Sequence, residues 1–258
     1  GYNRIPLVKT CYADLETPLS IFLKVANSSY SYLLESVEGG ENFGRYSIIG
    51  MPAKKLIQVR QKTVEIIESG KTIFTENNSD PLGFIDQYLC NYKTPENLDL
   101  PRFSGGLAGY FGYETIHYIE PKLIKEFIKD DLDLPDIRLM ESDEVIVFDN
   151  LTGKLSIVVY ANDDLSSYEL AINRLTKIEL MIESQLKNEN AQSKKNIEET
   201  LADSEFGEKN FHQAVDKIKE YIVDGDVMQV VLSQRMVKKF QLPAISLYRV
   251  LRSINPSP

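Results

Sequence analysis

Short runs of apolar and β-branched residues that alternate with polar ones dominate the first 160 positions. Alternation with a period of two residues is typical of strands that bury one face. The runs with this pattern are residues 30–35, 46–49, 56–60, 63–67, 71–74, 144–149 and 154–160. Turn residues separate several of them, among them Gly39-Gly40, Ser69-Gly70 and the segment 150–153. The pattern therefore predicts antiparallel sheets built from hairpins and a meander.

Helical signals lie between and after these strands. Thr17 and Asp80 each precede a proline, and a capping side chain followed by proline is a common start of a helix. The glycine-rich run 104–113 predicts a buried strand, because glycines allow close approach of backbones. Farther along, apolar residues recur at spacings of three and four. Together these signals predict helices over 17–26, 80–89, 114–119 and 167–186.

The polarity of the chain changes after residue 186. Only four of the 19 residues at 187–205 are apolar, a composition typical of a linker or an exposed loop. We therefore predict a first domain over 1–187, a polar linker over 188–206 and the beginning of a second domain over 207–258.

The last segment has a helical pattern around 211–222, an apolar run at 227–233 that predicts a long strand, and a helical pattern after Pro243. One helix–strand–helix unit cannot cover both faces of so apolar a strand. We therefore expect the chain to be a truncated part of a larger protein, with an incomplete second domain.

Composition excludes several classes of protein. The 258 residues are 43% hydrophobic and 26% charged, as in ordinary globular proteins, and the formal charge of −9 argues against a nucleic-acid platform. No run approaches the roughly 18 apolar residues of a membrane span. The two cysteines, Cys11 and Cys90, are too few for a disulfide framework, and no secretory leader is recognisable. We expect a cytoplasmic protein without nucleic-acid or membrane partners.

Generic catalytic motifs are absent from the sequence. It contains no phosphate-binding P-loop, no dinucleotide fingerprint, no zinc-protease helix and no nucleophile elbow. His117 and His212 lack a second ligand nearby, which favours structural or surface roles. The glycines at 105–112 favour tight strand packing over a phosphate cradle. The acidic run 130–133 lacks the glycine and terminal glutamate of a calcium loop.

Five longer phrases are more specific. The sequence reads LLESVEGGE at 33–41 and then GRYS at 44–47, GGLAGYFGYE at 105–114, SDEVIVFD at 142–149, GDVMQVVLSQ at 225–234 and NPSP at 255–258. In this order they resemble anthranilate synthase component I, of the chorismate-utilising enzymes. The resemblance covers nearly the whole chain.

The resemblance implies a lyase of tryptophan biosynthesis. Members of the family convert chorismate to anthranilate and pyruvate with Mg²⁺, using ammonia that a glutamine amidotransferase subunit, component II, releases. Their fold is α+β, an antiparallel two-sheet β-sandwich with helices packed outside. The family's catalytic histidine and metal-binding glutamates correspond to positions after Pro258. We therefore expect neither catalytic nor metal-binding residues in this chain, and no activity from it alone.

The resemblance also implies a feedback site for tryptophan. An amino acid needs an acceptor for its ammonium and a donor for its carboxylate, and prolines can hold a rigid loop against the indole. Arg45 is a further candidate beside this site. From the residues alone, Ser36 also reads as a strand-end hydroxyl and the last phrase as a turn. The implied site residues are Leu34, Glu35, Ser36, Asn255, Pro256, Ser257 and Pro258.

Gln229 is expected near the active site. Isochorismate synthases resemble this strand but carry a lysine at that position, which can act as general base. A glutamine cannot titrate, and it suits a nucleophile that arrives as ammonia. A buried strand glutamine satisfied by backbone is the alternative interpretation.

Two other functions remain open from the sequence. Aminodeoxychorismate synthase component I shares the glutamine and an amino-acid pocket. A stand-alone tryptophan-binding or subunit-docking module is the alternative from a different class of protein.

Overall fold

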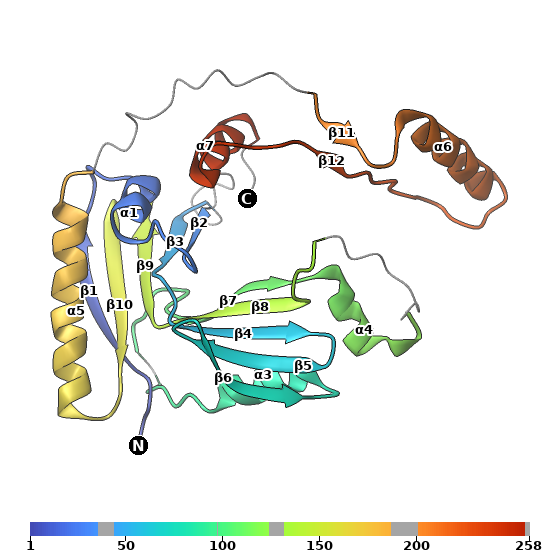
Figure 1. The fold of residues 1–258 in the computed structure, drawn as a ribbon. Helices are drawn as coiled ribbons and strands as arrows, with labels where there is room; N and C mark the ends of the chain where they lie inside the picture. Colours follow the sequence, from blue (N-terminus) through green and yellow to red (C-terminus); the bar gives the residue numbers. More distant parts are fainter. Residues whose placement is uncertain (36–43, 97, 124–131, 187–200, 256–258) are drawn as a thin grey trace. The chain divides into compact units, whose positions relative to one another are not determined.

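The computed structural model describes residues 1–35, 44–96, 98–123, 132–186 and 201–255 (Figure 1). The chain divides into two compact units, the first made of residues 1–187 with 257–258 and the second of 188–256. Among the described residues, no helix is both long and apolar enough to span a bilayer.

The first unit contains two antiparallel sheets of five strands each. In the first sheet the strands follow the order β1 (Ile5–Tyr12), β10 (Lys154–Ala161), β9 (Glu144–Asp149), β3 (Tyr46–Gly50) and β2 (Tyr32–Glu35). In the second sheet the order is β6 (Lys71–Asn77), β5 (Thr63–Glu68), β4 (Lys55–Arg60), β8 (Ile137–Ser142) and β7 (Gly106–Phe111). This confirms the α+β class with two antiparallel sheets.

Two helices cover one face of the first sheet. α5 (Leu165–Glu183) lies along β1 and β10, and α1 (Pro18–Val25) contacts α5, β2 and β3 (Figure 1). The register places Ile157, Ile146 and Ile49 side by side across three strands, and all three are buried. Burying a side chain of this size contributes roughly 1.5–3 kcal/mol, so this row is a main source of stability.

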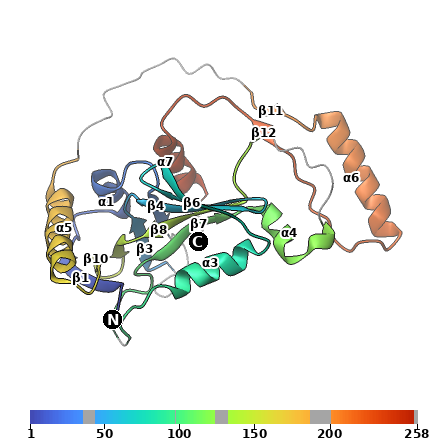
Figure 2. The same ribbon diagram turned by 60° about the horizontal axis from the view of Figure 1, so that its bottom comes forward.

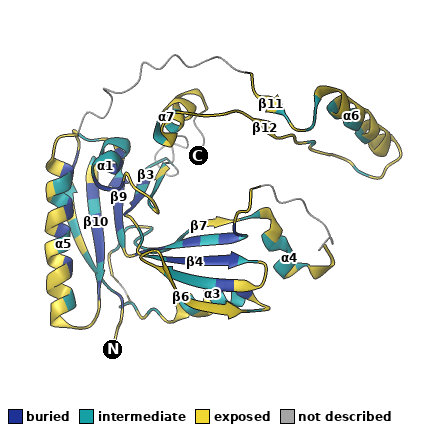
Figure 3. Cartoon of the chain, in the orientation of Figure 1, coloured by how far each residue is buried: buried dark blue, intermediate teal, exposed yellow. Residues whose placement is uncertain are grey.

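The second sheet has its own core beneath α3 (Pro81–Cys90), which lies along one of its faces (Figure 2). Figure 3 shows β4 and β8 as the buried centre of this sheet and β6 as its exposed edge. After β7, the chain forms the short helices η1 (Tyr113–Thr115), α4 (Ile116–Ile119) and η2 (Pro121–Leu123). The buried apolar residues of this core are Ile57, Val59, Val64, Ile85, Ile137 and Leu139.

The predicted helix starts are confirmed by their capping contacts. The Thr17 side chain accepts a hydrogen bond from the Ser20 amide, and the Asp80 side chain accepts one from the Gly83 amide. A cap of this kind stabilises a helix by about 1 kcal/mol. The strand that leads from the glycine-rich run into a short helix is also confirmed, but its predicted burial is wrong. β7 is an edge strand without a buried residue, because β8 is its one neighbour among the described strands.

A buried polar cluster lies where the two sheets meet, and we call it the Arg4 joint. β8 ends at Ser142 and β9 begins at Glu144, so a single residue, Asp143, connects the sheets. Buried Arg4 donates from Nη1 to Asp143 Oδ1 at 2.6 Å and from Nη2 to the Ser142 carbonyl at 2.8 Å.

Aromatic rings enclose the same guanidinium. The Arg4 Cζ atom lies 4.5 Å from the centre of the Tyr92 ring and 4.1 Å from that of Tyr160. A cation stacked on desolvated rings gains attraction from their quadrupoles. Gly105 packs against this group with φ +150°, and a Cβ atom there would lie 2.7 Å from the Ser142 carbonyl oxygen. A glycine is therefore required at this position by both conformation and space.

Burial controls protonation around the joint. Desolvation raises the pKa of Asp143, although the nearby Arg4 charge opposes this shift. Desolvation also raises the pKa of Tyr88, whose hydroxyl donates to buried Glu141 at 2.5 Å. The Tyr88 phenol therefore stays protonated and serves as a permanent donor to that carboxylate.

The second unit is built differently. It holds α6 (Glu208–Val223), α7 (Ala244–Ile254) and a two-residue ladder between β11 (Asp203–Ser204) and β12 (Met236–Val237). None of the residues of α6 and α7 is buried.

The strand predicted over 227–233 is wrong, because these residues form no regular structure in this unit. Apolar side chains within the segment are exposed, with Met228 98% and Val231 82% accessible. A central strand needs neighbours for its amides and covers for both faces. The described part of this unit offers only the short β11–β12 ladder, so the apolar pattern has no sheet to join.

Replacing Arg4 by leucine is expected to destabilise the chain by about 3 kcal/mol, because buried Glu141, 3.7 Å from Arg4 Nη1, would lose its cation. Urea unfolding monitored by circular dichroism measures this difference. Arg60→Leu is the matched control, since Arg60 pairs at 2.8 Å with Asp133, whose side chain is exposed. Loss of that surface pair should cost less than about 1 kcal/mol. Equal losses for the two variants would contradict a special role for the joint.

Candidate functional site

The β2–β3 hairpin carries the first part of the expected tryptophan site. Leu34 pairs with Ile48 and Glu35 with Ser47 across the two antiparallel strands. Leu34 is 53% exposed and Glu35 is half-buried, whereas Ser47 is buried. Ser36, the next residue, lies outside the described residues. The hairpin thus places Leu34 and Glu35 on opposite faces of an edge strand.

Arg45 immediately precedes β3 and binds a carboxylate on the neighbouring strand. Its Nε atom lies 3.0 Å and 3.1 Å from the two Asp149 oxygens, and its Nη2 atom lies 2.6 Å from Oδ2. Its Cζ atom lies 5.0 Å from the centre of the Tyr46 ring. This two-pronged arrangement fixes the guanidinium in one orientation.

The backbone and a second side chain reinforce the same contact. The Asn150 amide donates to the Arg45 carbonyl at 2.8 Å, and Asn150 Nδ2 lies 3.1 Å from Ser47 Oγ. Asp149 Oδ1 also accepts from the amide of Leu151 at 3.0 Å, within the turn before β10. We call Arg45, Asp149 and Asn150 the hairpin clamp. It joins β3 to the end of β9 by side-chain and main-chain bonds.

The clamp changes the electrostatics of its carboxylate. The hydrogen bonds from Arg45 hold the pKa of Asp149 at about 2, below its ordinary value, and backbone donors at Leu151 and Thr152 act in the same direction. The hydrogen bonds that Arg45 donates to Asp149 raise the pKa of Arg45. Both groups are therefore charged throughout the physiological pH range.

The second part of the expected tryptophan site is the phrase at 255–258, of which the structure describes one residue. Asn255 follows α7 and is exposed, and Pro256, Ser257 and Pro258 lie outside the described residues. The assignment of these four residues, with Leu34, Glu35 and Ser36, to one tryptophan site stays a prediction.

Gln229 is exposed and lies in the segment without regular structure. The alternative of a buried strand glutamine therefore does not describe this structure. Its placement near an active site stays a prediction.

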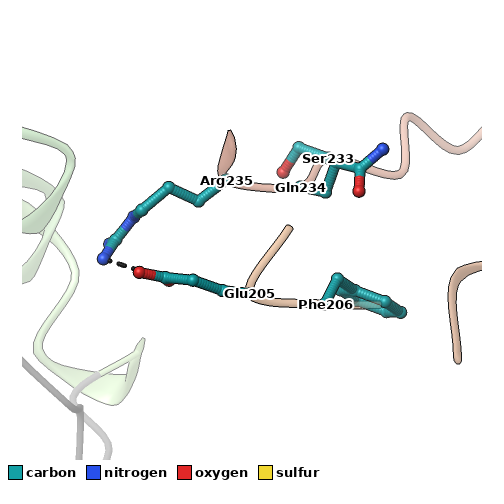
Figure 4. Close-up of a pocket in the computed structure, with 5 residues that line it drawn as sticks. All are labelled: Glu205, Phe206, Ser233, Gln234 and Arg235. Carbon is teal, nitrogen blue, oxygen red and sulfur yellow. Dashed lines mark ion pairs between the residues drawn. The ribbon is translucent and has the colours of Figure 1, made fainter. Parts of the chain in front are cut away.

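A shallow cavity of ≈ 460 Å³ lies in the second unit, at the end of the GDVMQVVLSQ phrase (Figure 4). Arg235 Nη1 lies 3.3 Å from Glu205 Oε2 across its mouth, and the Glu205 amide donates to the Arg235 carbonyl at 3.2 Å. The Ser204 hydroxyl donates to Gln234 Oε1 at 2.8 Å. Sequence reasoning missed this grouping, since no motif links positions about 30 residues apart. The lining residues are Glu205, Phe206, Ser233, Gln234 and Arg235.

The cavity offers polar groups but no reactive centre. Glu205 and Arg235 neutralise one another, and the remaining lining consists of a hydroxyl, an amide and a phenyl ring. Such a set can orient a polar ligand by hydrogen bonds, but it contains no cysteine, histidine or lysine.

In the part of the chain that the structure describes, no group of three or more His, Cys, Asp or Glu side chains could hold a metal ion. The described residues therefore do not fit Mg²⁺, whose usual ligands are carboxylate oxygens and water. Cys11 and Cys90 are free, and burial raises the pKa of the half-buried Cys11 thiol.

The hairpin clamp predicts a specific acid response. A carboxylate whose pKa is lowered by folding adds stability that is present above about pH 4 and lost as the pH falls towards 2. We expect Arg45→Gln to lower the free energy of unfolding at pH 7 and the difference from wild type to shrink between pH 5 and pH 2. Urea titrations over this range measure it. A difference independent of pH would show that Asp149 is not the titrating partner.

The sequence of the chain matches one family of known proteins and several of its members. A model of the chorismate binding enzymes matches residues 31–258. "Anthranilate synthase component 1" of Neisseria meningitidis serogroup B (strain MC58) is 48% identical over 262 residues, which cover 100% of this chain and 52% of that protein. The protein of the same name from Pseudomonas aeruginosa is 43% identical over 100% of this chain and 53% of its own length. The chain thus spans about half the length of the curated relatives it matches.

A solved structure agrees in fold. The crystal structure of anthranilate synthase component I from Streptococcus pneumoniae TIGR4 superposes with a TM-score of 0.62 at 22% identity, and the match covers 95% of this chain and 52% of that one. The family model matches more than half of the residues, including both the hairpin clamp and the cavity of the second unit. The chain belongs to the family of chorismate binding enzymes.

Proposed function

We propose that this chain is part of an anthranilate synthase component I. The observation that carries the proposal is the identity of 40–48% to proteins of that name, maintained over 100% of this chain. The complete enzyme would convert chorismate and ammonia to anthranilate and pyruvate, as a carbon–oxygen lyase of tryptophan biosynthesis in the cytoplasm. A component II amidotransferase would release the ammonia from glutamine.

In this proposal the chain supplies scaffold and regulation. Its described residues include no group of three or more His, Cys, Asp or Glu side chains that could hold Mg²⁺. Mg²⁺ is proposed as the cofactor of the complete enzyme, and no step of the reaction is assigned to it through this chain. Gln229 is proposed to lie near the bound substrates, where its amide can donate and accept hydrogen bonds but cannot remove a proton.

Tryptophan is proposed as the feedback inhibitor. Leu34, Glu35 and Ser36 would contribute one side of its site, and the Asn-Pro-Ser-Pro phrase at 255–258 the other. The support for this is the match of both phrases to the family, together with an exposed edge strand that presents Leu34.

The two alternatives have less support. The curated relatives named above are anthranilate synthases, and none of them is named as an aminodeoxychorismate synthase. A stand-alone tryptophan-binding module has no counterpart among these relatives, which are about twice as long as this chain. The product of the complete enzyme distinguishes the first alternative, because anthranilate and aminodeoxychorismate differ in mass.

The purified 258-residue chain is expected to form no anthranilate from chorismate, ammonium and Mg²⁺. A chimera that joins this chain to the unmatched half of the Neisseria meningitidis relative should form it, since it restores a complete component I. Anthranilate fluorescence measures both. Mg²⁺-dependent turnover by the short chain would refute the assignment to scaffold and regulation, and a folded but inactive chimera would refute the proposed function.

Ser36→Phe in the complete enzyme is expected to weaken tryptophan inhibition by about tenfold or more, because a phenyl ring would occupy space needed by the ligand and remove a hydrogen-bonding hydroxyl. The kcat with ammonium should stay unchanged. Inhibition curves at fixed chorismate measure the effect, with Ser31→Phe as the control, a substitution at a half-buried serine just before the same strand. Unaltered inhibition would remove Ser36 from the site.

A further inference from the structure

We propose that the hairpin clamp is a positioning device for the tryptophan response, acting through the register of β2 and not through contact with the ligand. This inference rests on the proposed function. It assigns Arg45, Asp149 and Asn150 a regulatory role without placing them in the tryptophan site.

The dependence of β2 on β3 is the first step. β2 is the last strand of its sheet, and β3 is its one neighbour among the described strands. An edge strand has main-chain partners on a single side, so its position follows that of its neighbour. The position of Leu34 and Glu35 therefore follows from that of β3.

The clamp fixes β3 at the end nearest to these residues. Tyr46, the first residue of β3, pairs with Asp149, the last residue of β9. Arg45 and Asn150 flank this pair and bond across it through side chain and backbone. Asn150 also reaches Ser47, the cross-strand partner of Glu35.

If β3, with β2 paired to it, moved by one residue along β9, the faces of both strands would change. A shift of one residue turns every side chain of a strand to the opposite face. It would exchange the faces of exposed Leu34 and half-buried Glu35. An ion pair at the shared end of β3 and β9 resists such a shift, because both charged groups would separate from their partners.

The geometry of Arg45 also favours a positioning role over direct contact with tryptophan. The Nε and Nη2 atoms of Arg45 are directed at Asp149, which accepts from Leu151 as well. Two donors of the guanidinium are thus engaged within the fold. A ligand carboxylate could take over these two donors only by breaking the bonds that hold the pKa of Asp149 at about 2.

The same strand provides a matched control. Arg174 on α5 makes a two-pronged pair with Glu144 at the other end of β9, with Nε–Oε1 2.8 Å and Nη2–Oε2 2.6 Å. The exposed fractions are similar, 31% and 20% for this pair against 34% and 15% for Arg45 and Asp149. The control pair joins α5 to the first residue of β9, at the opposite end of that strand from Asp149.

The experiment uses the complete enzyme and measures ammonium-dependent anthranilate formation at increasing tryptophan. We expect Arg45→Gln to raise the half-inhibitory concentration about tenfold, the effect of losing one well-placed charged contact. The kcat and the KM for chorismate should stay unchanged. Arg45→Lys, which keeps the charge but loses the fork, should give an intermediate shift. Asp149→Asn, which retains an acceptor for the Leu151 amide, should shift inhibition in the same direction as Arg45→Gln.

Arg174→Gln should lower the melting temperature by an amount similar to Arg45→Gln and leave tryptophan inhibition unchanged. Equal shifts of inhibition in both variants would overturn the inference, because they would reflect general destabilisation. Unchanged inhibition in Arg45→Gln and Asp149→Asn would overturn it as well. A wild-type enzyme that forms anthranilate but ignores tryptophan would instead refute the feedback part of the proposed function, and the inference with it.

Discussion

The Arg4 joint is the constraint on which the first unit depends. Each sheet buries its own apolar residues under its own helices, whereas the joint brings together groups from both. A buried guanidinium is stable only when its charge and donors are matched. Asp143, the Ser142 carbonyl and two tyrosine rings provide that match. The glycine-rich phrase of the sequence includes Gly105, whose missing side chain leaves room for this arrangement.

The two units differ in how far their apolar residues are covered. In the first unit, the isoleucines of three adjacent strands are buried beneath helices. In the second, α6 and α7 contain no buried residue, although both have apolar faces. Helices of this length draw most of their stability from packing.

Sequence pattern was sufficient for most of the first unit, because local signals there agree with the tertiary structure. Alternation predicted the β4–β5–β6 meander and the β9–β10 hairpin, and the cap-proline pairs predicted α1 and α3. β1 and β8 were not predicted. β1 contains Pro6, which disfavours a strand interior but is tolerated at a sheet edge. β8 interleaves Arg138 and Glu141 with apolar residues, and its charges find partners only through distant residues such as Gln58 and Arg4.

The candidate site was less accessible to prediction. The family phrases identified Leu34, Glu35 and Arg45, but the partner of Arg45 is 104 positions away and no local pattern indicates it. The prediction of a strand over 227–233 was wrong for the opposite reason. The apolar pattern of these residues is strong, but the described part of the second unit contains no sheet in which they could pair as a strand.

The one-residue passage from β8 to β9 has a consequence for how such a chain tolerates changes in length. Because successive side chains of a strand point to opposite faces, an added or deleted residue at position 143 would invert one sheet relative to the other. Ile146 and Phe148 would then point away from α5, or Leu139 away from the core beneath α3. Insertions and deletions that preserve folding should therefore accumulate in the other connections and spare this one.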